Sequence, residues 1–164
     1  AAFLAVFLLP GLPGMLGEAH ALLHGRAEDD FGSGRIYIWK NVWQAVKERP
    51  LFGGGPDTLS RRITAYFERY DEAGHIVRRT GIDTAHNEYL NILANQGLFA
   101  LICWLGALGC SAVRFVRRAG ERPAALICGS AVLGYCVQAF FGISMCLSTP
   151  FFVIAWAMLE TREN

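Results

Sequence analysis

The sequence predicts an all-α polytopic membrane protein with transmembrane helices and one large extracytoplasmic loop that contains amphipathic helices. Hydrophobic residues make up 53% of the 164 residues and charged residues only 18%, whereas a soluble domain carries about 25% charged residues. The charges are also unevenly spread, since 20 of the 29 lie between Glu18 and Asp83, ten of each sign. Long stretches outside this segment are therefore free of charge, as a bilayer requires.

The chain begins with an apolar run that is already ending at Pro10-Gly11, within residues 1–16. We expect this run to be the end of a truncated transmembrane helix, because no basic segment precedes it as in a signal peptide. On this interpretation the chain is the C-terminal part of a larger protein, and the fragment is inactive by itself.

Residues 17–85 form the predicted loop. An amphipathic helix is predicted over 34–49, with Ser33 as its N-cap. It rests on apolar residues that recur at helical spacing, namely Ile36, Trp39, Val42, Trp43 and Val46. The apolar face either lies in the lipid headgroup layer or packs on other parts of the loop, and both interpretations stay open. A second helix is predicted over 58–70.

Residues 86–164 contain three predicted transmembrane helices. The uncharged run Tyr89–Val113 exceeds the about 20 residues that a helix needs to cross a bilayer. The next uncharged run, Pro123–Leu159, is long enough for two short helices joined by a hairpin near 142–148. Thr149-Pro150 predicts the start of the last helix, with Thr149 as N-cap. The expected spans are about 89–113, 123–141 and 149–161.

Basic residues predict the orientation of these helices. Four arginines fill the link between the first two spans, which should therefore be cytoplasmic: Arg114, Arg117, Arg118 and Arg122. The loop at 17–85 then lies in the periplasm or outside the cell. We expect a multi-pass protein of the bacterial cytoplasmic (inner) membrane.

Several kinds of site are disfavoured by the sequence. The net charge of +1 argues against nucleic acid as a partner. His20 and His24 lie four apart, but no HExxH motif is present, so we expect no metal and no cofactor. The run Gly53–Gly55 lacks the Lys-Ser/Thr of a nucleotide-binding loop and predicts a structural turn.

His86 is the candidate catalytic residue. Asp83 or Thr84 is the predicted cap of the helix that follows, which would place His86 in the first turn, where the helix dipole favours neutral imidazole. A neutral imidazole at a membrane boundary can take a proton from a hydroxyl group. The alternative is that His86 and Asn87 only cap and anchor the helix end.

Five arginines in the loop are candidate phosphate ligands: Arg35, Arg61, Arg62, Arg78 and Arg79. Their planar guanidinium groups match the geometry of phosphate oxygens. Arg35 precedes the tryptophan-bearing helix and is expected to lie close to the membrane.

The order of four short motifs resembles the O-antigen ligase and O-antigen polymerase-like membrane proteins. The motifs are Arg35-x-x-x-Trp39, Pro50-Leu51-Phe52-Gly53-Gly54-Gly55-Pro56, His86-Asn87-x-x-Leu90 and, nine residues after Asn87, Gly97-Leu98-Phe99-Ala100. Two positions depart from the family pattern. Asp57 stands where the family usually has another glycine, and Ala100 stands where it has glycine, threonine or tyrosine.

The resemblance implies a metal-independent glycosyltransferase of lipopolysaccharide or other polysaccharide biosynthesis. Such an enzyme moves a glycan from a polyprenyl (undecaprenyl) diphosphate donor to an acceptor hydroxyl on the outer face of the membrane. The acceptor would be lipid A core, another glycan or a protein. By the resemblance, His86 would be catalytic, while Arg35, Asn87, Arg61 and Arg62 would bind substrate. A polymerase of the same family and a non-catalytic transporter of lipid-linked glycan are the alternatives.

Overall fold

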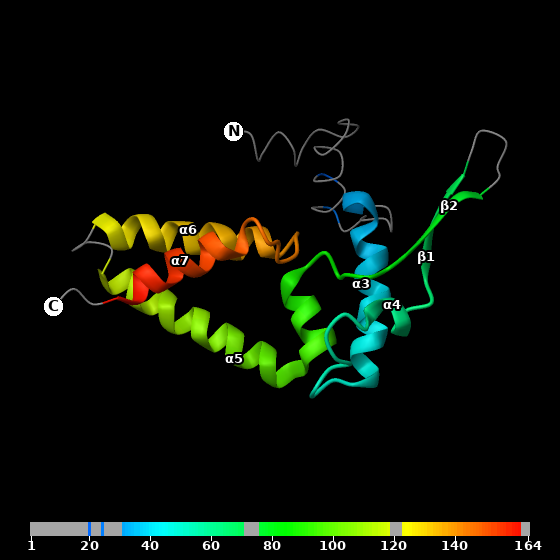
Figure 1. Ribbon diagram of the computed structural model, residues 1–164, viewed down its shortest axis with the longest axis horizontal. Coiled ribbons are helices and arrows are strands. Elements are labelled where there is room, and N and C mark those ends of the chain that lie inside the picture. Colours follow the sequence, from blue (N-terminus) through cyan, green and yellow to red (C-terminus); the bar gives the residue numbers. More distant parts are fainter. Residues whose placement is uncertain (1–19, 21–23, 25–30, 71–75, 119–122, 162–164) are drawn as a thin grey trace. The chain divides into compact units, whose positions relative to one another are not determined.

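The computed structural model describes His20, His24 and residues 31–70, 76–118 and 123–161 (Figure 1). The chain divides into two compact units, Ala1–Asn41 and Val42–Asn164. Helices dominate the described residues, which confirms the helical character predicted from the sequence. The helix end predicted over 1–16 lies outside the described residues.

Helix α3, Phe31–Glu48, corresponds to the amphipathic helix predicted over 34–49. It begins at Phe31, so Ser33 lies inside the first turn, and its prediction as the N-cap was wrong. The helix ends at Glu48, shortly before Pro50, because proline lacks the N–H of a helical residue and its ring clashes with the preceding turn. In its C-terminal half Val42, Ala45 and Val46 are buried, whereas Trp43 is half-exposed. This half therefore packs largely on protein.

A short helix and the first strand of a two-stranded sheet take the place of the helix predicted over 58–70. Helix α4 covers only Leu59–Arg62, and strands β1, Tyr66–Tyr70, and β2, Ile76–Gly81, pair antiparallel with Tyr66 opposite Gly81. Aromatic residues in β1 and β-branched residues in β2 favour strands over helix. The predicted all-α class is corrected accordingly, and the sheet is a local hairpin within a mostly helical chain.

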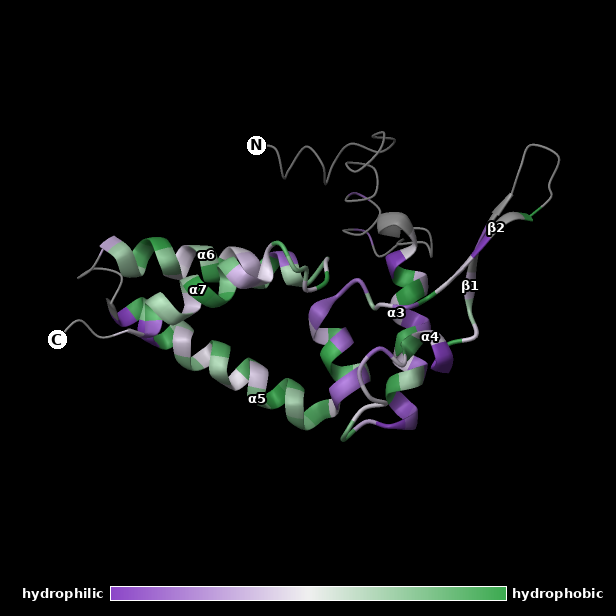
Figure 2. Ribbon diagram, in the orientation of Figure 1, coloured by the Kyte–Doolittle hydropathy of each residue, from purple (hydrophilic) through white to green (hydrophobic). Residues whose placement is uncertain are grey.

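Three apolar helices follow, namely α5 (Glu88–Arg118), α6 (Pro123–Ala139) and α7 (Thr149–Glu160). Figure 2 shows that hydrophobic residues prevail along all three. In the described part of the chain, α5 is the one helix long and apolar enough to cross a membrane, and α6 and α7 are shorter. Helix α5 is not continuous, because Gly97 has a φ of 88° and a ψ of −179° and breaks it into two segments. The span predicted at about 89–113 therefore lies within a helix that is kinked at Gly97.

The start of α7 lies one residue from the predicted position. Ser148, rather than Thr149, occupies the N-cap position, and Pro150 lies in the first turn. Since Pro150 has no N–H to leave unpaired, the first turn forms around it without loss of a hydrogen bond.

Aromatic contacts hold α5, α6 and α7 together. The Tyr135 ring of α6 stacks on Phe152 of α7 with ring centroids 4.1 Å apart. Trp104 of α5 meets Trp156 of α7 edge-on at 5.4 Å. Other large apolar side chains of these helices are more than half exposed, including Ile102, Val116, Ile127, Val137 and Phe151. Such a surface is typical of a protein that contacts lipid or further helices.

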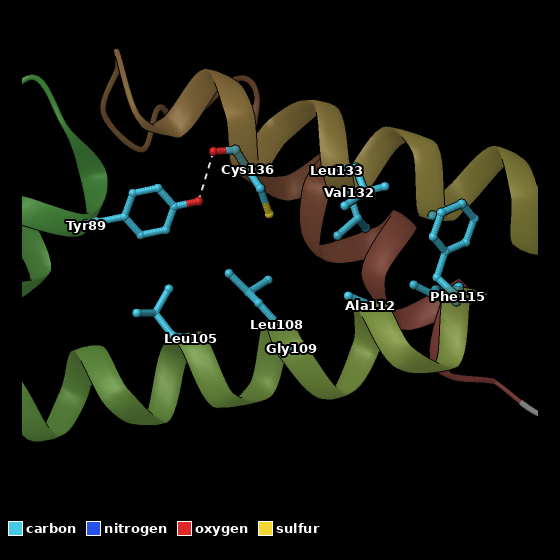
Figure 3. A pocket seen from close by; sticks show the side chains of 11 residues that line it. Tyr89, Leu105, Leu108, Gly109, Ala112, Phe115, Val132, Leu133 and Cys136 are labelled. Atoms are coloured by element: carbon cyan, nitrogen blue, oxygen red, sulfur yellow. Dashed lines mark hydrogen bonds between the residues drawn. The ribbon is translucent and has the colours of Figure 1, made fainter. Parts of the chain in front are cut away.

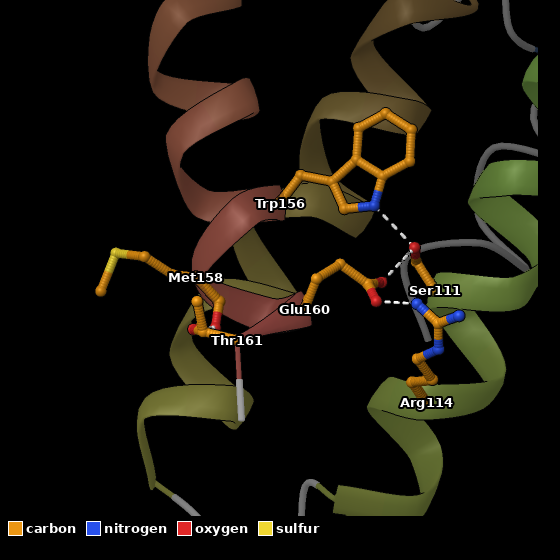
Figure 4. Close-up of polar contacts among 6 residues, drawn as sticks. All are labelled: Ser111, Arg114, Trp156, Met158, Glu160 and Thr161. Carbon is orange, nitrogen blue, oxygen red and sulfur yellow. Dashed lines mark hydrogen bonds and ion pairs between the residues drawn. The ribbon is translucent and has the colours of Figure 1, made fainter. Parts of the chain in front are cut away.

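A polar cluster joins one end of α5 to the end of α7 (Figure 4). Ser111 Oγ donates to Glu160 Oε1 at 2.6 Å, and Trp156 Nε1 donates to Ser111 Oγ at 2.6 Å. Arg114 forms an ion pair with the other carboxylate oxygen of Glu160. The cluster satisfies polar groups that would be costly to leave unpaired between apolar helices.

Candidate functional site

Asn87 is the N-cap of α5. Its Oδ1 accepts a hydrogen bond from Leu90 N–H at 2.9 Å, and its carbonyl accepts one from Asn91 N–H at 2.9 Å. Both are the bonds expected of a capping asparagine, and the side chain is buried. The prediction that Asp83 or Thr84 caps this helix was wrong, because the chain stays non-helical until Asn87.

His86 lies immediately before this cap. It was predicted in the first turn of the helix, but it lies just outside that turn. Its backbone is left-handed, with a φ of 47°. Histidine is one of the few side chains enriched in that region, and strained backbone of this kind is concentrated at functional sites. Ala85 and Asn87 on either side are buried, whereas His86 itself is exposed. None of the described residues hydrogen-bonds the imidazole, which stands at the positive end of α5.

The loop that contains the glycine run is hydrogen-bonded to both segments of α5, one on each side of the break at Gly97. The N–H groups of Gly54 and Gly55 donate to the carbonyls of Ala94 and Asn95 at 3.0 and 2.8 Å. On the other side of the break, the N–H groups of Leu98 and Phe99 donate to the carbonyls of Pro50 and Leu51 at 2.9 and 3.5 Å. A broken helix leaves these backbone groups without intrahelical partners, and the loop supplies partners to both segments. Two of the four sequence motifs thus form one structural element.

Glycine is required where the loop and the helix touch. A Cβ on Gly97, at a φ of 88°, would lie within 2.3 Å of the Leu51 carbonyl oxygen and 2.6 Å of Gly53 N. A Cβ on Gly53, at a φ of 68°, would meet the carbonyl carbon of Asn95 at 2.4 Å. Both positions combine left-handed backbone with close backbone approach, so no other residue fits without displacement. The glycine run serves as a structural turn.

Asp57 lies in the same loop and has a φ of 54°. Glycine adopts this conformation without strain, whereas aspartate tolerates it at a moderate cost. This explains why glycine suits the position and why the departure from the family pattern leaves the turn intact.

Arg62 contributes to the same scaffold. Its Nη1 donates to the Ala94 carbonyl at 2.8 Å, and its Nη2 donates to the Ala45 carbonyl at the end of α3. The adjacent Arg61 is exposed. The hydrogen bonds give Arg62 a structural role that the sequence did not reveal, and Arg61 is the better placed of the two to meet a soluble anion. Phosphate binding by either residue stays a prediction.

Arg35 lies on α3 and is half-buried. It belongs to the unit Ala1–Asn41, whereas His86 belongs to the unit Val42–Asn164. Their juxtaposition at one site therefore stays a prediction.

An apolar cavity of about 260 Å³ lies between α5 and α6 (Figure 3). Its walls include Leu105, Leu108 and Leu133, and Tyr89 closes one side by donating its hydroxyl to the Cys136 carbonyl at 2.9 Å. Such walls suit a hydrocarbon chain and not a sugar or a phosphate.

Two features of the site were missed from the sequence. The break at Gly97 had a signal, a glycine inside a helical run, that was not interpreted as a break. The other is Glu88, whose carboxylate binds Ser144 of the α6–α7 hairpin. Sequence pattern alone gives no signal for this contact, because it joins residues 56 apart.

Comparison with known proteins gives one family. The model of the family described as O-antigen ligase matches residues 1–105, which include all four motifs. No curated protein and no solved structure matches the chain.

Proposed function

The chain belongs to the O-antigen ligase family, and from this premise we propose that it transfers a glycan from a polyprenyl-diphosphate donor to an acceptor hydroxyl. The reaction would take place on the outer face of the bacterial cytoplasmic membrane. Membership in the family implies glycan transfer by a membrane-associated protein, without specifying which donor and acceptor are used. Donor, acceptor and site residues are our proposal.

The observation that carries the proposal is the state of His86. Its imidazole is exposed beside the capped end of α5, on left-handed backbone between two buried neighbours. In the proposed step, the acceptor oxygen forms a bond to the anomeric carbon while the bond from that carbon to the diphosphate oxygen breaks. The acceptor proton passes to His86, and polyprenyl diphosphate leaves with its electron pair.

The other predicted residues would assist this step. Arg35 and Arg61 would pair with the diphosphate and stabilise the charge that develops as it leaves. Asn87 Oδ1 is occupied by the cap, so a contact with substrate would fall to its Nδ2. We assign Arg62 to the scaffold on the strength of its bonds to Ala45 and Ala94.

The proposed topology follows from the charges on α5. Helix α5 carries His86 before its first turn and Arg114, Arg117 and Arg118 at its other end. Basic residues favour the cytoplasmic side, so His86 would face outward together with the loop at 17–85. We propose that α6 and α7 also cross the membrane, giving a multi-pass protein.

A polymerase of the same family remains the second candidate, since it differs in the acceptor and not in the chemistry. Transport of a lipid-linked glycan without chemistry is less favoured. Transporters place ionisable groups near the bilayer midplane, whereas the segment from Tyr89 to Val113 carries no charge.

Glycan transfer in membranes of a strain that lacks its own copy of the enzyme tests the proposal. The full-length protein would carry either His86→Asn or Arg35→Ala. The control is Lys47→Ala, which removes an exposed positive charge from the same helix as Arg35. Asparagine is chosen because it tolerates left-handed backbone and so removes the imidazole without added strain. We expect His86→Asn to lose about 100-fold or more of the transfer rate, as for a general base, and Lys47→Ala to match wild type.

Full transfer by a normally expressed His86→Asn protein would overturn the proposal and leave His86 as part of the helix cap. The products separate the two candidates, because a ligase caps the acceptor once and a polymerase extends it.

A further inference from the structure

The first turn of α5 is hydrogen-bonded to the α6–α7 hairpin through the carboxylate of Glu88. Glu88 Oε2 accepts a hydrogen bond from Ser144 N–H at 2.8 Å, and Glu88 Oε1 accepts one from Ser144 Oγ at 2.6 Å. Both oxygens of Glu88 thus bind the same residue, 56 positions away in the sequence. Such charge-assisted pairs fix geometry as well as adding stability.

The next residue strengthens the same attachment. The Tyr89 hydroxyl donates to the Cys136 carbonyl near the end of α6, and the Tyr89 ring lies 6.5 Å from the ring of Phe140. Two consecutive residues therefore hold the turn at 140–148 against the start of α5. His86, the proposed base, lies two residues before Glu88.

We propose that Glu88 is a positioning residue. Its pair of hydrogen bonds with Ser144, the Glu88–Ser144 clasp, holds the turn at 140–148 in place as one wall of the acceptor site beside His86. The inference rests on the proposed function, since His86 takes the acceptor proton and the groups next to it therefore face the acceptor. The turn offers both apolar and polar groups there, with Phe141, Met145 and Leu147 at least half exposed.

Two simpler roles for Glu88 make different predictions. A carboxylate in the first turn stabilises a helix through its dipole, and aspartate would do this equally well. Aspartate is one methylene shorter, however, and would not reach Ser144. A role as the catalytic base is disfavoured because both oxygens already accept hydrogen bonds.

Steady-state kinetics of the purified full-length protein test the clasp. The variants are Glu88→Asp, Glu88→Gln, Ser144→Ala and the double variant Glu88→Asp/Ser144→Ala. Ser130→Ala is the matched control, because Ser130 is an exposed serine on α6 that lies outside the turn at 140–148. We expect Glu88→Asp to raise the acceptor KM about tenfold and Ser144→Ala about fivefold, with Glu88→Gln in between.

The pattern across variants distinguishes a clasp from general destabilisation. We expect kcat and the donor KM to stay within about threefold of wild type, and the double variant to be no worse than Glu88→Asp, since the two residues share one contact. A wild-type acceptor KM for Glu88→Asp, or effects of the two single changes that multiply, would overturn the clasp.

The outcomes also separate this inference from the proposed function. If His86→Asn abolishes transfer while Glu88→Asp and Glu88→Gln keep the wild-type acceptor KM, the proposed function stands and the clasp is wrong. If His86→Asn transfers normally, both are overturned.

Discussion

Replacing Gly97 with alanine should detach the loop at 50–55 from α5. The new Cβ would lie 2.3 Å from the Leu51 carbonyl oxygen and 2.6 Å from Gly53 N, and both are backbone atoms that cannot rotate away. Alanine would also be strained at a φ of 88°.

The magnitude follows from these contacts. The left-handed strain costs about 1–2 kcal/mol. Displacing Leu51 and Gly53 weakens one or two of the neighbouring backbone hydrogen bonds, each worth about 1 kcal/mol. Together these effects destabilise the closed state, in which the loop is hydrogen-bonded to α5, by about 3 kcal/mol. The open population, in which the loop is detached from α5, therefore becomes roughly 100-fold larger. Alanine adds to this shift because it favours a continuous helix.

Limited proteolysis measures the open population. Chymotrypsin cleaves after Phe52, whose side chain is exposed, but cleavage requires the backbone to leave its hydrogen bonds. We expect cleavage of the full-length protein in mild detergent to accelerate about 100-fold in Gly97→Ala. Gly106→Ala is the control, since its Cβ would meet nothing within 4 Å and its helix would be unchanged. Equal cleavage rates in the two variants would refute the argument that the loop closes the break.

Three further substitutions test individual contacts, each read as the apparent melting temperature of the full-length protein. Arg62→Ala should destabilise by about 2 kcal/mol because two carbonyls lose a charged donor, while the exposed neighbour Arg61→Ala should be neutral; equal effects would contradict the structural role of Arg62. Asn87→Ala should cost about 1 kcal/mol by removing the cap on Leu90 N–H, and Asn87→Asp should restore it, so an Asp variant as unstable as the Ala variant would argue against the cap. Asp57→Gly should be neutral or stabilise by up to about 1 kcal/mol because it relieves left-handed strain, and a clear loss of stability would show that the aspartate side chain is needed.

The sequence predicted elements whose signal is local. An uncharged run longer than a bilayer span gave α5, and the pair Thr149-Pro150 gave the start of α7 to within one residue. Helical periodicity gave α3 to within a few residues. These predictions needed only hydrophobic spacing and the conformational limits of proline.

Features that depend on contacts between distant segments were not predictable in the same way. The glycine run was assigned to a turn, but its pairing with the break at Gly97 depends on a segment more than 40 residues away. The β1–β2 hairpin was missed because its charged residues resembled an exposed helix, although its aromatic and β-branched content favoured strands. Arg61 and Arg62 are adjacent residues of the same type, and only their contacts in the folded chain distinguish them: Arg62 donates hydrogen bonds to the carbonyls of Ala45 and Ala94, whereas Arg61 is exposed.

The most direct test of the central claim compares donor binding with turnover in His86→Asn. The purified full-length protein would be assayed for equilibrium binding of the lipid-diphosphate-linked glycan and for its transfer to acceptor under the same conditions. If His86 is the base that takes the acceptor proton, donor affinity stays within about threefold of wild type while turnover falls about 100-fold or more. Unchanged turnover, or parallel loss of binding and turnover, would contradict that role.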